Sequence, residues 1–79
     1  MNVEICKRLQ RGDWYSYSTE YPIRWKILRV YGDNSFDKMF FDKRTGEQRP
    51  ARCRRLDMTL PQLVKLFEED KMVFVPPPL

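Results

Sequence analysis

Two stretches rich in strand-forming residues, separated by a cluster of turn residues, limit this chain more than any other feature. Residues 23–31 and 36–42 are dominated by aromatic, β-branched and other large apolar side chains, and the sequence Gly32-Asp33-Asn34-Ser35 lies between them. Glycine, asparagine and aspartate tolerate the backbone angles that tight turns need. The sequence therefore predicts an antiparallel hairpin, which needs further strands or a helix to cover its apolar face.

The first of these strands changes its apolar phase. Ile23, Trp25 and Ile27 occupy alternate positions, but Leu28 and Val30 continue the pattern one position later. Successive side chains of a strand point to opposite faces, so a slip of one residue predicts a β-bulge or a strong bend. Such a bend favours a small sheet that curls.

Weaker signals indicate additional strands. Residues 13–18 and 72–75 contain short runs of strand formers, and residues 48–53 are interpreted as a short edge strand broken by Pro50. Thr45-Gly46 predicts the preceding turn, with Gly46 at a positive φ. The apolar positions of residues 1–12 fit either a short helix or the approach to a strand.

One helix is predicted near the C-terminus, from Thr59 to about Glu69. Thr59 and Gln62 have the spacing of a capping box. A single apolar stripe follows, formed by Leu60, Leu63, Val64 and Phe67. The expected fold is therefore α+β and mainly β: a small curled antiparallel sheet or an SH3-like barrel of four to five strands, with one helix near the C-terminus.

The length of 79 residues predicts a single domain, residues 1–75, followed by a polyproline tail, residues 76–79. A chain this short buries only about 60% of the surface that its unfolded form exposes, so most large side chains are needed inside. The expected core aromatics are Trp25, Phe40, Phe41 and Phe67. Trp14 and the tyrosines are freer to face a partner.

Positive charge is concentrated in one segment. The whole chain has a net charge of +4, whereas residues 43–55 contain six cations and only Glu47 as an anion, or +5. The six cations are Lys43, Arg44, Arg49, Arg52, Arg54 and Arg55. Arginine makes bidentate contacts with phosphates and carboxylates, so this segment predicts a site for nucleic acid or for an acidic protein surface.

Neighbouring residues could enlarge this site. Arg24, Lys26 and Arg29 lie on the adjoining strand, and Trp14, Tyr15 and Tyr17 offer faces on which bases could stack. The competing interpretation is that the cations only keep a small domain soluble and protect a sheet edge from pairing.

The residues that most enzymes use are missing. The chain has no histidine, only two widely separated cysteines and three isolated glycines, so no catalytic site, metal, cofactor or small-molecule substrate is predicted. Asp33, Asp37 and Asp42 are interpreted as turn and strand-end residues. Cys53 could be a reactive thiol among arginines or a small core residue.

The expected location is the cytoplasm. No apolar run approaches the roughly 18 residues that span a bilayer, and the chain opens without an apolar signal region. Membrane partners are therefore not expected, and Cys6 and Cys53 are expected to be free thiols.

From Leu9 onward the chain resembles the small β-barrel domain beside the catalytic core of Mu-type and Tn7-like DDE transposases. The resemblance covers Leu9, Gly12-Asp13, residues 25–30, residues 39–42, Thr45-Gly46-Glu47 and residues 60–74. It implies a module that helps to hold a transposase complex on DNA without catalysis of its own. The chain carries no D, D and E catalytic domain.

Two functions are therefore predicted. The first is a non-enzymatic module of a phage or mobile genetic element that contacts nucleic-acid phosphates through its arginine-rich edge. The alternative is a phage-encoded, protein-binding inhibitor or adaptor, similar in kind to anti-CRISPR proteins. It would use the same cations on an acidic protein patch, or the surface of Trp14 and Tyr17.

Overall fold

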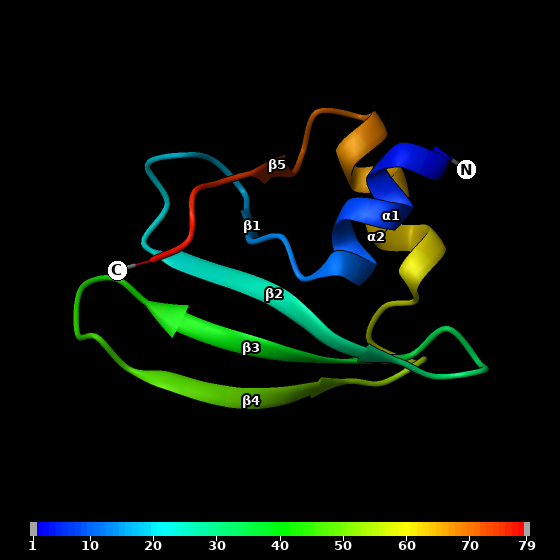
Figure 1. Ribbon diagram of the computed structural model, residues 1–79, viewed down its shortest axis with the longest axis horizontal. Helices are drawn as coiled ribbons and strands as arrows, with labels where there is room; N and C mark the ends of the chain where they lie inside the picture. Colours follow the sequence, from blue (N-terminus) through cyan, green and yellow to red (C-terminus); the bar gives the residue numbers. More distant parts are fainter. Residues whose placement is uncertain (1, 79) are drawn as a thin grey trace.

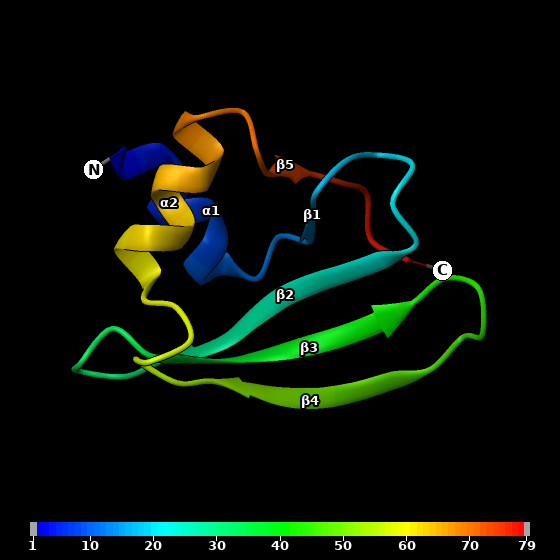
Figure 2. The same cartoon turned by 180° about the vertical axis from the view of Figure 1, so that it is seen from behind.

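A curled antiparallel sheet of five strands forms the body of the protein, and two helices pack together at the end where the second and third strands are joined (Figures 1 and 2). The computed structural model describes residues 2–78; Met1, and Leu79 of the predicted tail, lie outside the described residues. The elements in chain order are α1 (Val3–Arg11), β1 (Tyr15–Ser16), β2 (Ile23–Val30), β3 (Phe36–Asp42), β4 (Gln48–Cys53), α2 (Leu60–Glu68) and β5 (Val73–Phe74). The strand order is β4-β3-β2-β1-β5. The predicted class, α+β and mainly β, is confirmed. Of the two forms expected, the structure shows the curled antiparallel sheet, which is open.

The hairpin β2–β3 and its irregularity both follow the sequence pattern. The pairing register shifts between Ile27 and Arg29, so Leu28 is the extra residue of a bulge. The turn closes through two hydrogen bonds: the backbone N–H of Tyr31 donates to the carbonyl of Ser35, and that of Asn34 donates to the carbonyl of Tyr31. Asn34 adopts the left-handed conformation with a φ of 67°. The predicted hairpin and bulge are thus confirmed, and asparagine rather than glycine supplies the positive φ of this turn.

The register of the strands assigns the side chains of β2, β3 and β4 to the two faces of the sheet. Phe36 pairs with both Val30 and Cys53, and these side chains belong to the core or pack against it. We call this side the inner face. Alternation places the following side chains on the opposite side, which we call the outer face: Arg24, Lys26 and Arg29 from β2; Asp37, Met39 and Phe41 from β3; Gln48, Pro50 and Arg52 from β4.

Both helices cover the inner face with apolar side chains. Helix α2 buries the predicted stripe of Leu60, Leu63, Val64 and Phe67, while α1 contributes Leu9, which is fully buried. The side-chain oxygen of Gln62 accepts a hydrogen bond of 2.8 Å from the backbone N–H of Thr59, as a capping box requires. The core forms between these helices, Tyr15, Ile27 and Phe36.

Helix α1 resolves the open question of residues 1–12. The side chain of Asn2 accepts hydrogen bonds from the backbone N–H groups of Glu4 and Ile5, which caps the first turn, and Gly12 ends the helix with a φ of 91°. Strand β1 is shorter than the predicted 13–18 at both ends. The backbone N–H of Asp13 donates to the carbonyl oxygen of Arg8 in closing the helix, and the chain bends at Tyr17 and Ser18 directly after the strand.

Strand β4 forms one edge of the sheet, as predicted, and Pro50 limits what that edge can bind. The backbone N–H of Asp42 donates to the carbonyl of Glu47. By alternation, the backbone N–H and C=O groups of residues 49, 51 and 53 bond to β3, while those of residues 48, 50 and 52 point away from the sheet edge. Pro50 has no N–H at the middle of this outward row. The edge therefore lacks a donor that an added strand would need.

The proline segment is not a free tail. Arg24 donates a hydrogen bond of 3.2 Å to the carbonyl oxygen of Pro76, and Val75 donates one of 2.9 Å to Trp14. Pro78 lines a shallow groove with Arg24, Phe41 and Lys43. Residues 76–78 therefore lie over one end of the outer face, which accounts for the burial of Phe41 outside the main core.

Candidate nucleic-acid interface

The six cations of residues 43–55 do not form one surface. Lys43 and Arg44 lie in the turn between β3 and β4, and Arg54 and Arg55 follow the other end of β4, about 20 Å away for a strand of six residues. Between them, Arg49 points to the inner face and Arg52 to the outer face. Strand β4 therefore holds apart cations that lie close together in the sequence.

Most of these cations already have acidic neighbours. The pairs are Arg44 with Asp42 at 3.0 Å, Arg49 with Glu47 at 3.0 Å, Arg52 with Asp37 at 3.5 Å and Arg54 with Asp57 at 3.7 Å. The Asp42 carboxylate is only 9% exposed, but the other three pairs are more exposed. Exposed ion pairs contribute roughly 0–1 kcal/mol each, so a phosphate can replace the carboxylate of those three at little cost. Within residues 2–78, Lys43 and Arg55 have no ion pair.

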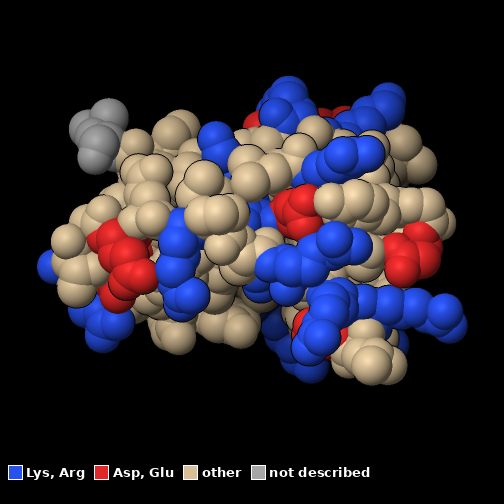
Figure 3. All heavy atoms as spheres, turned by 90° about the horizontal axis from the view of Figure 1, so that it is seen from below, with Lys and Arg blue, Asp and Glu red and all other residues tan. Residues whose placement is uncertain are grey.

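The outer face gathers cations from separate parts of the chain. Arg24 and Lys26 occupy it by simple alternation, and the bulge at Leu28 turns Arg29 to the same side. Arg52 joins them from β4 across Asp37. Four cations and one anion thus share a sheet surface opposite the two helices. Figure 3 shows the molecule from below, from the side of β4, with more Lys and Arg toward the end where the helices lie.

Tyr31 organises the most exposed part of this face. The guanidinium carbons of Arg52 and Arg29 lie 4.1 Å and 5.0 Å from its ring centroid. Its hydroxyl donates a hydrogen bond to Asp37, and this bond raises the pKa of the Tyr31 hydroxyl. The two guanidinium groups are therefore oriented before any ligand arrives, which reduces the entropy lost on binding.

The candidate stacking residues divide between the two faces. Trp14 lies on the outer side, with the Lys26 ammonium 5.3 Å from its ring and Phe41 edge-on at 6.3 Å. Tyr17 lies on the inner side against Trp25, with Tyr21 beside it. Trp14 and Tyr17 thus do not form the single surface that was predicted.

Tyr15 was wrongly assigned to a binding surface. Its ring is only 2% exposed and packs between Trp25 and Phe67 in the core. Burial raises the pKa of its hydroxyl. Among the predicted core aromatics, Phe41 and Phe67 are buried, whereas Trp25 and Phe40 are only half-buried.

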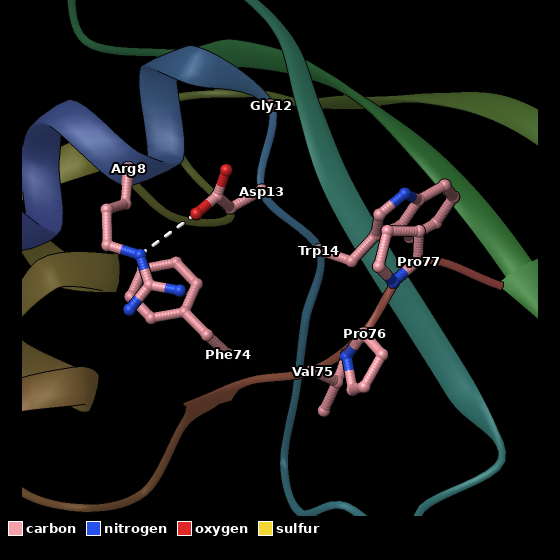
Figure 4. A pocket seen from close by; sticks show the side chains of 8 residues that line it. All are labelled: Arg8, Gly12, Asp13, Trp14, Phe74, Val75, Pro76 and Pro77. Atoms are coloured by element: carbon pink, nitrogen blue, oxygen red, sulfur yellow. Dashed lines mark hydrogen bonds and ion pairs between the residues drawn. The ribbon is translucent and has the colours of Figure 1, made fainter.

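A groove that the sequence did not predict lies beside the outer face. Its volume is about 490 Å³, and its lining comes from α1, the connection between α1 and β1, β5 and the segment that follows β5: Arg8, Gly12, Asp13, Trp14, Phe74, Val75, Pro76 and Pro77 (Figure 4). Had α1 been recognised as a helix, the spacing of Arg8 and Arg11 would have placed both on the side facing Asp13.

Asp13 holds the side of this groove together. Its carboxylate accepts hydrogen bonds from Nε of Arg11 at 2.9 Å, from Nη2 of Arg11 at 2.6 Å and from Nε of Arg8 at 2.9 Å. These contacts, those of Arg11 first, lower the pKa of Asp13 to about 2. The carboxylate is therefore ionised at neutral pH and fixes the plane of the Arg8 guanidinium.

The remaining candidates for chemistry have structural roles. Cys53 is 5% exposed, and burial raises the pKa of its thiol, so it is a core residue rather than an activated nucleophile. Asp33 caps the β2–β3 turn through Ser35, and Asp42 caps the next turn through the N–H of Arg44. Residues 2–78 contain no group of three or more potential metal ligands.

Comparison of the chain with models of known families, with curated proteins and with solved structures gives no match. The resemblance to the transposase β-barrel domain therefore stays a prediction. Neither described helix has the length and apolar composition needed to cross a bilayer.

Proposed function

We propose that this protein is a non-enzymatic module that binds nucleic acid through phosphate contacts made by the outer face of its sheet. The observation that carries the proposal is the placement of Arg24, Lys26, Arg29 and Arg52 on one side of the sheet, with both helices packed on the other; Arg29 and Arg52 are exposed, and Arg24 and Lys26 are half-buried. An exposed sheet face lined with cations follows an extended phosphate backbone without requiring a deep pocket. The transposase-like sequence pattern agrees with such a role in a mobile element or phage.

The number of cations sets the expected salt dependence. Four phosphate contacts predict that the logarithm of the association constant falls with the logarithm of salt concentration with a slope of about −3 to −4. Asp37 reduces the local charge but also positions Arg52 and Tyr31. Because phosphate contacts carry no base information, binding should show little preference for sequence.

The test compares two double variants of equal net charge. Arg29→Gln with Arg52→Gln removes the pair around Tyr31, whereas Lys7→Gln with Lys65→Gln removes two exposed cations from the helices. Binding can be measured by fluorescence anisotropy with labelled single-stranded and duplex DNA at several salt concentrations. The first variant should bind at least about tenfold more weakly than the unmodified protein, and the magnitude of its salt-dependence slope should be smaller by about 2. The helix variant should stay within about twofold of the unmodified protein.

Two results would overturn this proposal. One is the absence of binding even at low salt. The other is equal weakening by the two double variants, since that would show a response to net charge and not to the outer face.

One observation favours a protein partner as the second candidate. Tyr17 and Tyr21 are 51% and 40% exposed, and their rings pack edge-on to each other beside Trp25. Exposed tyrosine and tryptophan clusters are enriched in protein interfaces. If Tyr17→Ser with Tyr21→Ser abolishes capture of a protein from a host lysate and leaves DNA binding unchanged, the inhibitor or adaptor function is supported.

A further inference from the structure

The wall of the groove beside Asp13 is a stack of planar groups. The rings of Phe67 and Phe74 lie 4.4 Å apart with an angle of 28° between their planes. The guanidinium carbon of Arg8 lies 3.8 Å from the Phe74 ring centroid, on the side of the groove (Figure 4). The stack therefore starts in the core and ends with a guanidinium group at the groove.

The last layer of this stack is held in place but not covered. Asp13 accepts the Nε–H of Arg8 and fixes the orientation of the guanidinium group. The Arg8 side chain remains 39% exposed, and within residues 2–78 its two terminal nitrogens have no hydrogen-bond partner. A planar ligand can thus add a further layer, and the free N–H groups can donate to its acceptors.

The groove continues onto the outer face through Trp14. Trp14 lines the groove, contacts Phe41 and lies under the ammonium group of Lys26. The ring of Trp14 thus connects the groove to Lys26, a cation of the outer face. The groove volume of about 490 Å³ lies within the range of about 300–1,000 Å³ that is usual for small-molecule pockets.

We propose that this groove binds one unpaired base of a single-stranded nucleic acid, stacked on the guanidinium group of Arg8. The inference rests on the proposed function, because the outer-face cations hold the adjoining phosphates. Bases of a duplex are stacked on one another and paired, so they cannot enter a groove of this kind, whereas bases of a single strand can stack on aromatic rings and arginine planes. The protein should therefore prefer single strands to duplexes.

An abasic strand tests this in the unmodified protein. It keeps the phosphates of the matched single strand and lacks the bases. We expect the complete single-stranded DNA to bind about tenfold more tightly than the abasic strand, since stacking of one base has an effect of that size. A single-stranded RNA of the same sequence provides a separate arm, which tells whether the 2′-hydroxyl groups matter.

A pair of arginine variants locates the effect. Arg8→Lys keeps the charge and removes the planar group, and Arg11→Lys makes the same change in a residue that also contacts Asp13 but does not line the groove. Arg8→Lys should lower single-strand affinity about tenfold, leave duplex and abasic binding within about twofold, and so remove the preference for bases. Arg11→Lys should preserve that preference.

Trp14 gives an independent signal. In the variant Trp25→Phe it is the only tryptophan, and complete single strands should quench its emission more than abasic strands do. If the unmodified protein binds complete and abasic strands equally, the base site is excluded while phosphate binding stands. If no nucleic acid binds at all, the proposed function fails and this inference fails with it.

Discussion

Asp13 joins the end of α1 to the start of β1, and its replacement by asparagine measures how much that junction stabilises the fold. The carboxylate is 21% exposed and accepts three hydrogen bonds from two arginines. Asparagine has nearly the same shape but no charge. It retains one oxygen acceptor, so the change isolates the ionic part of these contacts.

The expected loss of stability follows from the pKa of Asp13. A decrease in this pKa from 3.8 to about 2 corresponds to about 2.4 kcal/mol of stabilisation of the ionised carboxylate in the folded protein relative to the unfolded chain. The side chains of Arg8 and Arg11 are 39% and 68% exposed, so screening by solvent reduces this to about 1 kcal/mol. For a domain of this size, such a loss lowers Tm by about 4–8 °C.

The effect of Asp13→Asn must also depend on pH in one direction. The folded pKa lies below the unfolded pKa, so the stabilisation is complete above pH 3.8 and disappears as the pH falls toward 2. Urea unfolding followed by tryptophan fluorescence should therefore show a difference of about 1 kcal/mol between the two proteins at about pH 7 and almost none near pH 2. A difference that persists at pH 2 would refute the ionic explanation.

A matched control removes an exposed carboxylate elsewhere. Glu68→Gln neutralises a residue at the unfavourable C-terminal end of α2, so it should leave stability unchanged or raise it slightly. If Glu68→Gln destabilises the protein as much as Asp13→Asn does, the loss reflects total charge and not the contacts of Asp13.

Three further predictions concern the core, the sheet edge and the thiols. Leu63→Ala should lower the free energy of unfolding by about 2–5 kcal/mol, measured by thermal unfolding, because Leu63 is only 1% exposed. Leu56 is 96% exposed, so Leu56→Ala should change Tm by less than about 2 °C. Equal effects of the two variants would contradict this packing. Pro50→Val restores the missing outward donor of β4 and should cause concentration-dependent self-association in size-exclusion chromatography, and a variant that stays monomeric would disprove the role given to Pro50. A thiol reagent should modify Cys6 quickly and Cys53 only after addition of urea; rapid modification of Cys53 in the folded protein would contradict its burial.

The elements that the sequence predicted well are those with a strong local pattern. The β2–β3 hairpin, the turn at Gly46 and helix α2 each depend on alternation, turn residues or capping that lie within a few positions of one another. Helix α1 stayed ambiguous because its short apolar pattern fits two structures, although the Asn2 cap was present in the sequence. The bounds of β1 were predicted too wide and the packing of the proline segment was missed, because contacts with distant residues determine both.

The candidate site was harder to predict than the fold, because charge along the chain is not charge on a face. Residues 43–55 carry the highest charge density in the sequence, but alternation along the predicted edge strand already separates Arg49 from Arg52, and the structure confirms that they lie on opposite faces. The outer face instead collects cations from two strands, and the bulge at Leu28 decides its composition. Without that extra residue, regular alternation would direct Arg29 to the inner face with Ile27. The phase slip that predicts a bulge or bend in the sheet therefore also places Arg29 beside Tyr31, across Asp37 from Arg52, and completes the basic surface.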